Sequence, residues 1–402
     1  MNSTSRRFSS GAYALWLVAA FCVAALCACG GDTTVASSSA DAGAMPAADG
    51  GGPGSGGHHA ITADWLNKSL TILDLDKLEA GAKRKDVVVA TIDLSKYSPG
   101  PMEVAVTPDG KTALVSISAG FFTIPGSAFL VNASSIPADP GTLLMVDLSA
   151  RKVVAELDTG KSPMGILITP DGTKAFVTNF GSAAIAIIDV VHRKLSGHVT
   201  VGQLSEELAL DDTGTVGIFS YSAAANVRTF DPADIAGTLS PDVALQGDSA
   251  GVAFFPGTKI AYVVDAPNPI INAVGGHNVV DVTNPKAPVV LENVRDASAP
   301  ISYPAVPFAA RKSVIVPAVV NGMLQLLEYR LANKKAELAS TTDVTKVTLF
   351  GAFHTTIDPQ GRVLCAVPRE HLLTVTDLTT KKSFSIDWGG TQPGPTDIQV
   401  IP

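Results

Sequence analysis

Acidic residues and one histidine stand at the beginnings of short apolar segments in this chain of 402 residues. Carboxylates and imidazole nitrogens bind divalent cations, and the same groups transfer protons as general acids and bases. If these segments are strands that start at one face of the molecule, their first residues form a single polar patch. The candidate ligand-binding residues at these positions are Glu103, Glu206, Asp248, Tyr303, His354 and Asp397.

A second pattern could belong to a serine hydrolase. Gly247-Asp-Ser-Ala-Gly251 matches the Gly-x-Ser-x-Gly nucleophile elbow, which needs a strand before it and a helix after it. The residues that follow, Val252-Ala-Phe-Phe255, instead predict a continuing strand. The spacing of the histidines matches no metal-binding motif. The sequence therefore predicts no catalytic residue and no bound cofactor, and it leaves the identity of any metal undecided.

The apolar segments that must position the polar patch repeat along the chain. Residues 102–111 and 164–173 are each an apolar strand ending in Thr-Pro-Asp-Gly, a sequence that reverses the chain tightly. Degenerate copies occupy residues 207–214, 251–257 and 355–361. Further short strands lie between the copies, at four strands per 42–62 residues. This spacing is typical of the blades of a β-propeller.

Counting first strands predicts an all-β, seven-bladed β-propeller of four-stranded antiparallel blades, in one domain over residues 58–402. Residues 60–64 and 70–74 look like second and third strands without a first strand, and the chain ends with an unpartnered strand at 396–401. We therefore expect the C-terminal strand to complete the N-terminal blade and close the ring. An aspartate ends the third strand of several blades, where its carboxylate should bind backbone amides of the turn. These residues are Asp74, Asp147, Asp231, Asp281 and Asp377.

Two long loops should rise beside the mouth of this propeller. Residues 119–141 and 266–277 connect second to third strands, on the face where the first strands begin. Binding sites commonly lie on such loops, because a rigid scaffold holds them in place. The first loop is apolar, and its Phe121, Phe122 and Phe129 are candidate partner-binding residues.

The third blade carries a family resemblance. Ala175-Phe-Val-Thr-Asn179, Ile185-Ala-Ile-Ile-Asp189 and Val199-Thr-Val-Gly202 resemble the strands of the Tyr-Val-Thr-Asn (YVTN) β-propeller repeat, which is similar to WD40 repeats in fold. The other blades match in strand spacing only. Lactonases and some redox-enzyme subunits resemble this fold, and their sites lie at the central mouth. In an enzyme of that kind, the acid–base or metal residues would be Glu103, Glu206, Asp248 and His354.

The first 57 residues predict an export signal followed by a flexible tether. Arg6 and Arg7 precede an apolar run that ends in Leu26-Cys-Ala-Cys29, so residues 1–28 are typical of a signal peptide. The ending resembles the bacterial lipobox, which implies covalent diacylglycerol on Cys29; a signal cleaved without lipid is the alternative. Gly30, where an aspartate would imply inner-membrane retention, favours the outer membrane. Residues 29–57 predict a flexible Gly/Ser/Ala tether.

Composition limits the classes of function. Asp and Glu number 37 against 29 Lys and Arg, with no basic run, so we expect no nucleic-acid partner. The leading hypothesis is an envelope lipoprotein whose propeller is a non-catalytic binding module for a protein or ligand, attached to the membrane by its lipid. The alternative is a propeller enzyme, lactonase-like or a redox-enzyme subunit. A third possibility is a scaffold that organises the cell surface by self-association.

Overall fold

The computed structural model describes residues 58–118, 141–201, 205–221, 225–245, 247–266, 275–295, 301–302, 304–348, 351–389 and 394–402. The predicted signal peptide, Cys29 and the tether lie outside these residues, as do Phe121, Phe122, Phe129 and Tyr303. For Asp248 the structure describes the backbone alone. Within the described ranges, no helix has the length and apolar character needed to cross a bilayer.

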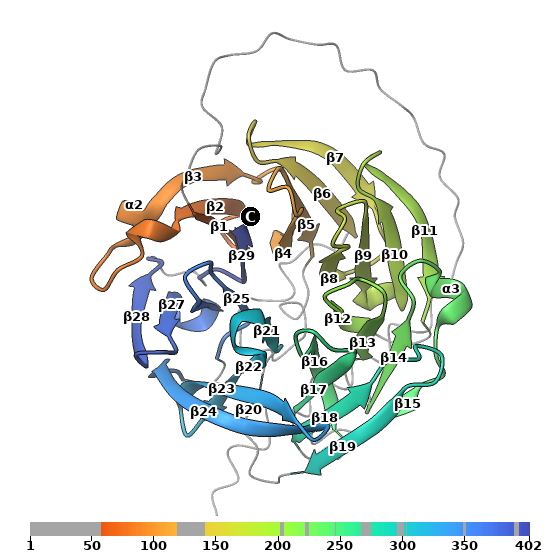
Figure 1. Cartoon of the computed structure of the whole chain (residues 1–402). Helices are drawn as coiled ribbons and strands as arrows, with labels where there is room; N and C mark the ends of the chain where they lie inside the picture. Colours follow the sequence, from red (N-terminus) through yellow and green to blue (C-terminus); the bar gives the residue numbers. More distant parts are fainter. Residues whose placement is uncertain are drawn as a thin grey trace, which may run out of the picture.

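Seven antiparallel sheets form a closed ring, which confirms the predicted seven-bladed β-propeller (Figure 1). The first three blades comprise β29 (Asp397–Ile401), β1 (His59–Asp64), β2 (Ser69–Asp74) and β3 (Val88–Asp93); β4 (Pro101–Val106), β5 (Thr112–Ile117), β6 (Thr142–Asp147) and β7 (Lys152–Asp158); and β8 (Pro163–Ile168), β9 (Lys174–Asn179), β10 (Ala184–Asp189) and β11 (Lys194–Thr200).

The other four blades continue around the ring in chain order. They comprise β12 (Ser205–Leu210), β13 (Gly217–Tyr221), β14 (Asn226–Phe230) and β15 (Val243–Ala244); β16 (Asp248–Phe254), β17 (Ile260–Ala266), β18 (Gly276–Asp281) and β19 (Val289–Arg295); β20 (Ile301–Ser302), β21 (Val306–Phe308), β22 (Ser313–Val320), β23 (Met323–Ala332) and β24 (Lys335–Lys346); and β25 (His354–Ile357), β26 (Arg362–Val367), β27 (Leu372–Asp377) and β28 (Lys382–Asp387).

Helices are single turns between strands. Within the ranges given above, the α-helical turns are α2 (Arg84–Val87) and α3 (Ile235–Thr238), and the 3₁₀ turns are η1 (Leu75–Lys77), η4 (Phe180–Ser182), η5 (Ala309–Arg311) and η6 (Pro368–Glu370).

The C-terminal strand closes the ring as predicted. β29 pairs antiparallel with β1, with Ile401 opposite His59 and Asp397 opposite Ala63. The first blade therefore joins the two ends of the described body by backbone hydrogen bonds, and the C-terminus lies beside β1 (Figure 1).

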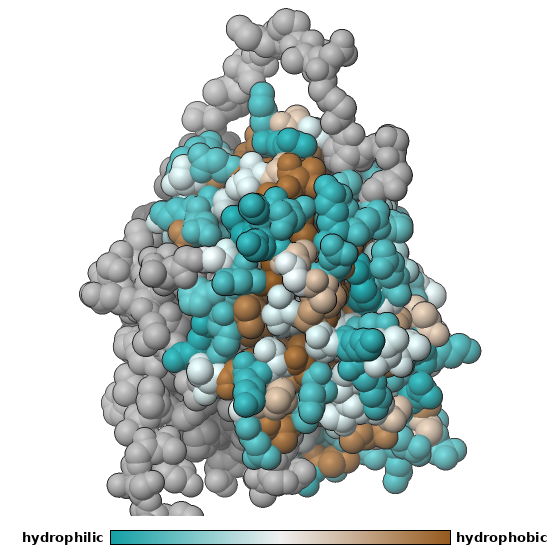
Figure 2. All heavy atoms as spheres, turned by 90° about the vertical axis from the view of Figure 1, so that its left-hand side faces the viewer, coloured by the Kyte–Doolittle hydropathy of each residue, from teal (hydrophilic) through white to brown (hydrophobic). Residues whose placement is uncertain are grey.

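Each blade buries both of its faces, because a neighbouring blade packs against each one. In β10, Ala186 and Ile188 join the core shared with the second blade, whereas Ile185 joins the core shared with the fourth. Such strands are apolar on both sides rather than alternating. Outer strands such as β3 instead alternate buried and exposed residues. A view onto the outer rim accordingly shows hydrophilic side chains beside narrow hydrophobic strips (Figure 2).

The two predicted turn devices also form. In the Thr-Pro-Asp-Gly turns, Gly110 and Gly172 take φ values of 68° and 70°, a left-handed conformation that favours glycine. At the ends of third strands, aspartate oxygens accept hydrogen bonds from backbone amides two or three residues later, for example Ala150 N to Asp147 Oδ1 at 2.8 Å. The same contact occurs at Asp74, Asp231, Asp281 and Asp377.

Candidate functional site: the axial cavity

One position of the innermost strand lines the axis of the ring. In the second, fourth and seventh blades it lies three residues before the end of β4, β12 and β25, where it holds Glu103, Glu207 and His354. In the third and fifth blades the same position is Gly165 and Gly251. The fold therefore repeats one inward-facing position, while the residue at that position differs from blade to blade.

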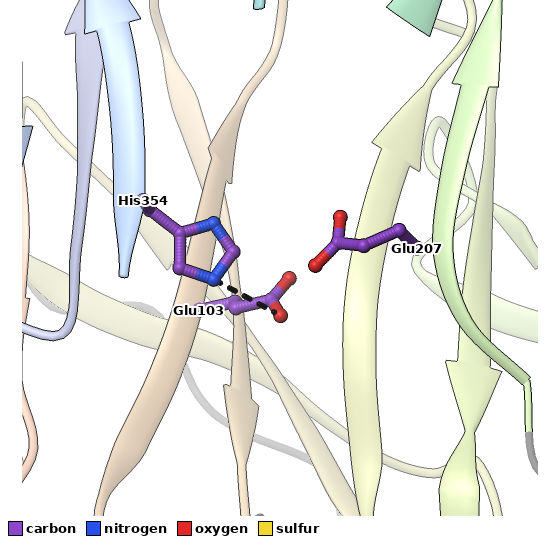
Figure 3. A group of neighbouring side chains, drawn as sticks. All are labelled: Glu103, Glu207 and His354. Carbon is purple, nitrogen blue, oxygen red and sulfur yellow. Dashed lines mark ion pairs between the residues drawn. The ribbon is translucent and has the colours of Figure 1, made fainter. Parts of the chain in front are cut away.

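These strands surround a cavity of about 240 Å³ that all seven blades line. Among the described residues, the ionisable side chains that line it are Glu103, Glu207, His354 and Asp397. Possible ligand atoms of Glu103, Glu207 and His354 all lie within 4.8 Å of one another. Figure 3 shows the two carboxylates and the imidazole ring turned toward a common point between the strands.

His354 is held between two carboxylates. Its Nε2 lies 3.4 Å from Glu103 Oε1, and its Nδ1 lies 3.7 Å from Asp397 Oδ1. Asp397 is itself anchored, because its Oδ2 accepts a hydrogen bond from Val104 N at 2.8 Å and its Oδ1 accepts one from Ile398 N at 2.6 Å. A carboxylate behind a histidine ring is the arrangement that orients histidine ligands in metal sites.

Glu103 is almost fully buried, at 4% exposure, yet one of its oxygens lacks a hydrogen bond. Among the described residues Oε1 makes no contact with hydrogen-bond geometry, and its ion-pair partner is His354 Nε2 at 3.4 Å. Buried carboxylate oxygens usually have a partner, since an unsatisfied one costs free energy. This oxygen therefore fits the ligand of an ion in the cavity.

A local irregularity of β12 presents Glu207 to the axis. The pairing of β12 with β13 shifts register between Ser205 and Leu208, and β4 shows the same shift between Pro101 and Val104. In both blades the amide of the inward glutamate donates to a serine of the second strand, Glu103 N to Ser116 Oγ and Glu207 N to Ser220 Oγ.

Gly165 occupies the blade between the two glutamates. A Cβ atom at Gly165 would lie 2.6 Å from the carbonyl oxygen of Glu206, so glycine lets β12 approach β8 closely. Thr178 Oγ1 donates to the same oxygen at 2.6 Å.

Burial and crowding of like charges shift the proton affinities of this cluster. Burial raises the pKa of Glu207 to about 8, and the negative charge of Glu103 adds to the rise. Burial alone would lower the pKa of His354, but the charges of Asp397 and Glu103 outweigh it and raise that pKa to about 10. Burial also raises the pKa of Asp397. At neutral pH the cluster therefore holds protons on Glu207 and His354.

Three of the six sequence-predicted site residues meet here: Glu103, His354 and Asp397. Glu206 is not among the residues that line the cavity in the described part of the chain; its neighbour Glu207 lines it instead. Tyr303 and the side chain of Asp248 lie outside the described residues. Glu206 was predicted because it stands at the start of the strand, but the register shift between Ser205 and Leu208 turns Glu207 toward the axis instead.

A signal for Glu207 was present in the repeat. Glu103, Glu207 and His354 each stand seven residues before the glycine of the following turn, at Gly110, Gly214 and Gly361. Aligning the copies on that glycine would have placed the three residues at one position. At the Gly-x-Ser-x-Gly pattern, Ser249 lies buried within β16, and the strand runs on to Phe254 as predicted.

No family model and no curated protein sequence matches this chain. Solved structures do resemble it. The periplasmic gluconolactonase of Pseudomonas aeruginosa matches with a TM-score of 0.63 and 14% identity over 86% of this chain and 99% of its own. A protein of unknown function from Desulfotomaculum acetoxidans matches with a TM-score of 0.63 and 15% identity over 85% and 98%. A putative 6-phosphogluconolactonase of Bacteroides uniformis matches with a TM-score of 0.62 and 12% identity over 86% and 99%.

At these identities the likeness shows the fold alone, because one fold carries many activities. The chain is a β-propeller whose structural neighbours include lactonase-like proteins.

Proposed function

We propose that this protein binds a divalent cation in the axial cavity of its propeller, with Glu103 Oε1, a Glu207 oxygen and His354 Nε2 as ligands. The observation that carries the proposal is the convergence of these three groups within 4.8 Å. One nitrogen and two carboxylate oxygens suit a first-row ion such as Mn²⁺ or Zn²⁺.

Two further features support the site. Glu103 Oε1 accepts no hydrogen bond of good geometry among the described residues and has only the His354 ring at 3.4 Å, so an ion would give this buried oxygen a close partner. Asp397, anchored by two backbone amides, would orient the His354 ring through Nδ1. Three protein ligands leave coordination positions open toward the cavity, where an ion could bind a small molecule.

We place this binding protein in the cell envelope, tethered to the outer membrane through diacylglycerol on Cys29. The lipobox-like Leu26-Cys-Ala-Cys29 and the glycine-rich tether support the placement. Labelling with a radioactive fatty acid tests it: the native chain should incorporate label, and Cys29→Ala should not.

Calorimetric titration of the chelator-treated full chain with Mn²⁺ or Zn²⁺ tests the cation site. We expect one ion per chain, and about 100-fold weaker binding in Glu207→Gln. Glu206→Gln is the matched control, because it removes the same charge one residue away and should retain the affinity. Equal weakening in both variants, or no saturable binding in the native chain, would contradict the proposal.

Hydrolysis of a cyclic ester is the second candidate. The open coordination positions face the cavity, where an ion could polarise a carbonyl oxygen. The likeness in fold to a gluconolactonase makes glucono-1,5-lactone the first compound to assay. Metal-dependent turnover that His354→Ala abolishes would support catalysis, whereas stoichiometric binding without turnover would leave the binding function alone.

A further inference from the structure

We propose that the axial cavity accepts a compact, uncharged ligand with an oxygen donor at one end and an apolar body, and that it rejects phosphorylated and carboxylate compounds. The inference rests on the proposed function, since the bound ion would receive the oxygen donor.

The cavity has two unlike sides. The seventh, first and second blades are adjacent in the ring and contribute His354, Asp397 and Glu103. The fifth and sixth blades are also adjacent and contribute an apolar wall. Its more exposed residues are 304–307 of the sixth blade, which read Pro-Ala-Val-Pro. Val252, Ala253 and Phe254 of the fifth blade line the cavity behind them, but they are at most 5% exposed, because their side chains pack into the cores between blades. A ligand that bound the ion and extended toward the sixth blade would therefore meet carbon atoms there.

The charge of the site disfavours anions. In the part of the chain that the structure describes, the cavity is lined by three carboxyl side chains, those of Glu103, Glu207 and Asp397, against a single imidazole, that of His354. No Lys or Arg lines the cavity within the described residues. A phosphate or carboxylate entering this partly buried space would meet repulsion without a compensating cation.

The segments of the propeller outside the described ranges add no positive charge to the cavity. The stretches between residues 58 and 402 that lie outside the described ranges contain no Lys, Arg or His, as their sequences show. These segments therefore contribute no cationic side chain to the mouth of the cavity. A cavity of about 240 Å³ is also smaller than the roughly 300–1,000 Å³ of pockets for drug-sized ligands, which favours a compact ligand.

Proton relaxation of small probes around bound Mn²⁺ tests the inference with the full chain in detergent. The probes are cyclohexanol and cyclohexanecarboxylate, which share a ring and differ in charge. Because the paramagnetic ion relaxes nearby protons, we expect cyclohexanol to show at least about tenfold greater enhancement than the carboxylate, equivalent to about 1.4 kcal/mol of discrimination. Excess Zn²⁺ should abolish the enhancement by displacing Mn²⁺.

Replacing one residue of the apolar wall sharpens the test. Val306→Lys would put a cation on that wall, so the preference should shift by about tenfold or more toward the carboxylate. If native protein binds Mn²⁺ but relaxes the carboxylate as strongly as the alcohol, or relaxes neither, the inference is overturned while the cation site stands. If Mn²⁺ itself does not bind, the proposed function fails first.

Discussion

Two buried carboxylates on neighbouring blades have opposite surroundings. Asp64, at the end of β1, accepts hydrogen bonds at both carboxylate oxygens. Its Oδ1 accepts from Thr62 Oγ1 at 3.1 Å and from Trp388 Nε1 at 3.0 Å, and its Oδ2 accepts from the hydroxyls of Thr71 and Ser69. Glu103, on β4, is equally buried, but its Oε1 has no hydrogen bond among the described residues.

The difference separates a structural carboxylate from one suited to binding. The hydrogen bonds of Asp64 tie the first blade to Trp388, which follows the last strand of the seventh, so they strengthen the closure of the ring. Glu103 Oε1, which accepts no hydrogen bond of good geometry among the described residues, lines a cavity beside Glu207 and His354. The two carboxylates are similarly buried, so they differ in the number of hydrogen bonds that they accept rather than in burial.

The largest expected effect is on stability, at the carboxylate that accepts hydrogen bonds at both oxygens. Asp64→Ala leaves the Thr62 and Thr71 hydroxyls and the Trp388 indole without their shared acceptor, so we expect a loss of about 3 kcal/mol in the free energy of unfolding. Urea denaturation measures this. Cation affinity of the folded variant should stay within about twofold of the native value, and a parallel loss of affinity would remove the distinction between the two sites.

The next effect is on binding at the axial cluster. His354→Ala removes the nitrogen ligand, and we expect cation affinity to fall about 100-fold or more. Titration calorimetry measures the affinity. His198→Ala is the control, because this histidine contacts Thr159 O, away from the cavity. Unchanged affinity in His354→Ala would exclude His354 as a ligand.

A smaller loss of cation affinity should follow when the carboxylate that orients the His354 ring is removed. Asp397→Asn keeps the size of the side chain but removes the charge behind Nδ1, so we expect cation affinity to fall about tenfold. Nuclear magnetic resonance of the His354 ring should report a lowered imidazole pKa in the cation-free variant, because a carboxylate that raises it is gone. A purely structural contact would leave that pKa unchanged.

The smallest effect is a change in the pH dependence of stability without cation. The folded pKa of Glu207 is about 8, above the value of 4.5 for an unperturbed glutamate. Between these values the unfolded chain loses a proton that the folded chain keeps, so stability falls as pH rises. Glu207→Gln removes this contribution and should flatten the fall between pH 5 and 8, by at most about 1.4 kcal/mol per pH unit.

Unfolding curves from pH 5 to 9 measure this slope. His354, whose folded pKa is about 10, should preserve a decline above pH 6.5 in both proteins. Glu206→Gln again serves as the matched control and should retain the native slope. Identical slopes in the native and Glu207→Gln proteins would show that Glu207 is ionised at neutral pH.

Most of the architecture was predictable because it is local. Pro and Gly preset the backbone of the turns, and each aspartate at the end of a third strand binds amides only two or three residues away. The pattern of turns therefore located the strands and counted the blades. The unpaired strands at the two ends then implied the closure of β29 on β1.

The site was predictable in part. Glu103, His354 and Asp397 were predicted because they stand at the starts of innermost strands, and the structure brings these three residues together. It could not separate Glu206 from Glu207, because in a regular strand adjacent residues face opposite sides and one shift of register exchanges them.

The amino-acid sequence by itself determined the strands, the turns, the number of blades and the chemical types available at the axis, since these depend on neighbours along the chain. Tertiary structure alone decided which carboxylates are satisfied and which glutamate faces the cavity. Those outcomes depend on pairing register and on contacts between residues as distant as Asp397 and Val104, which no local pattern encodes.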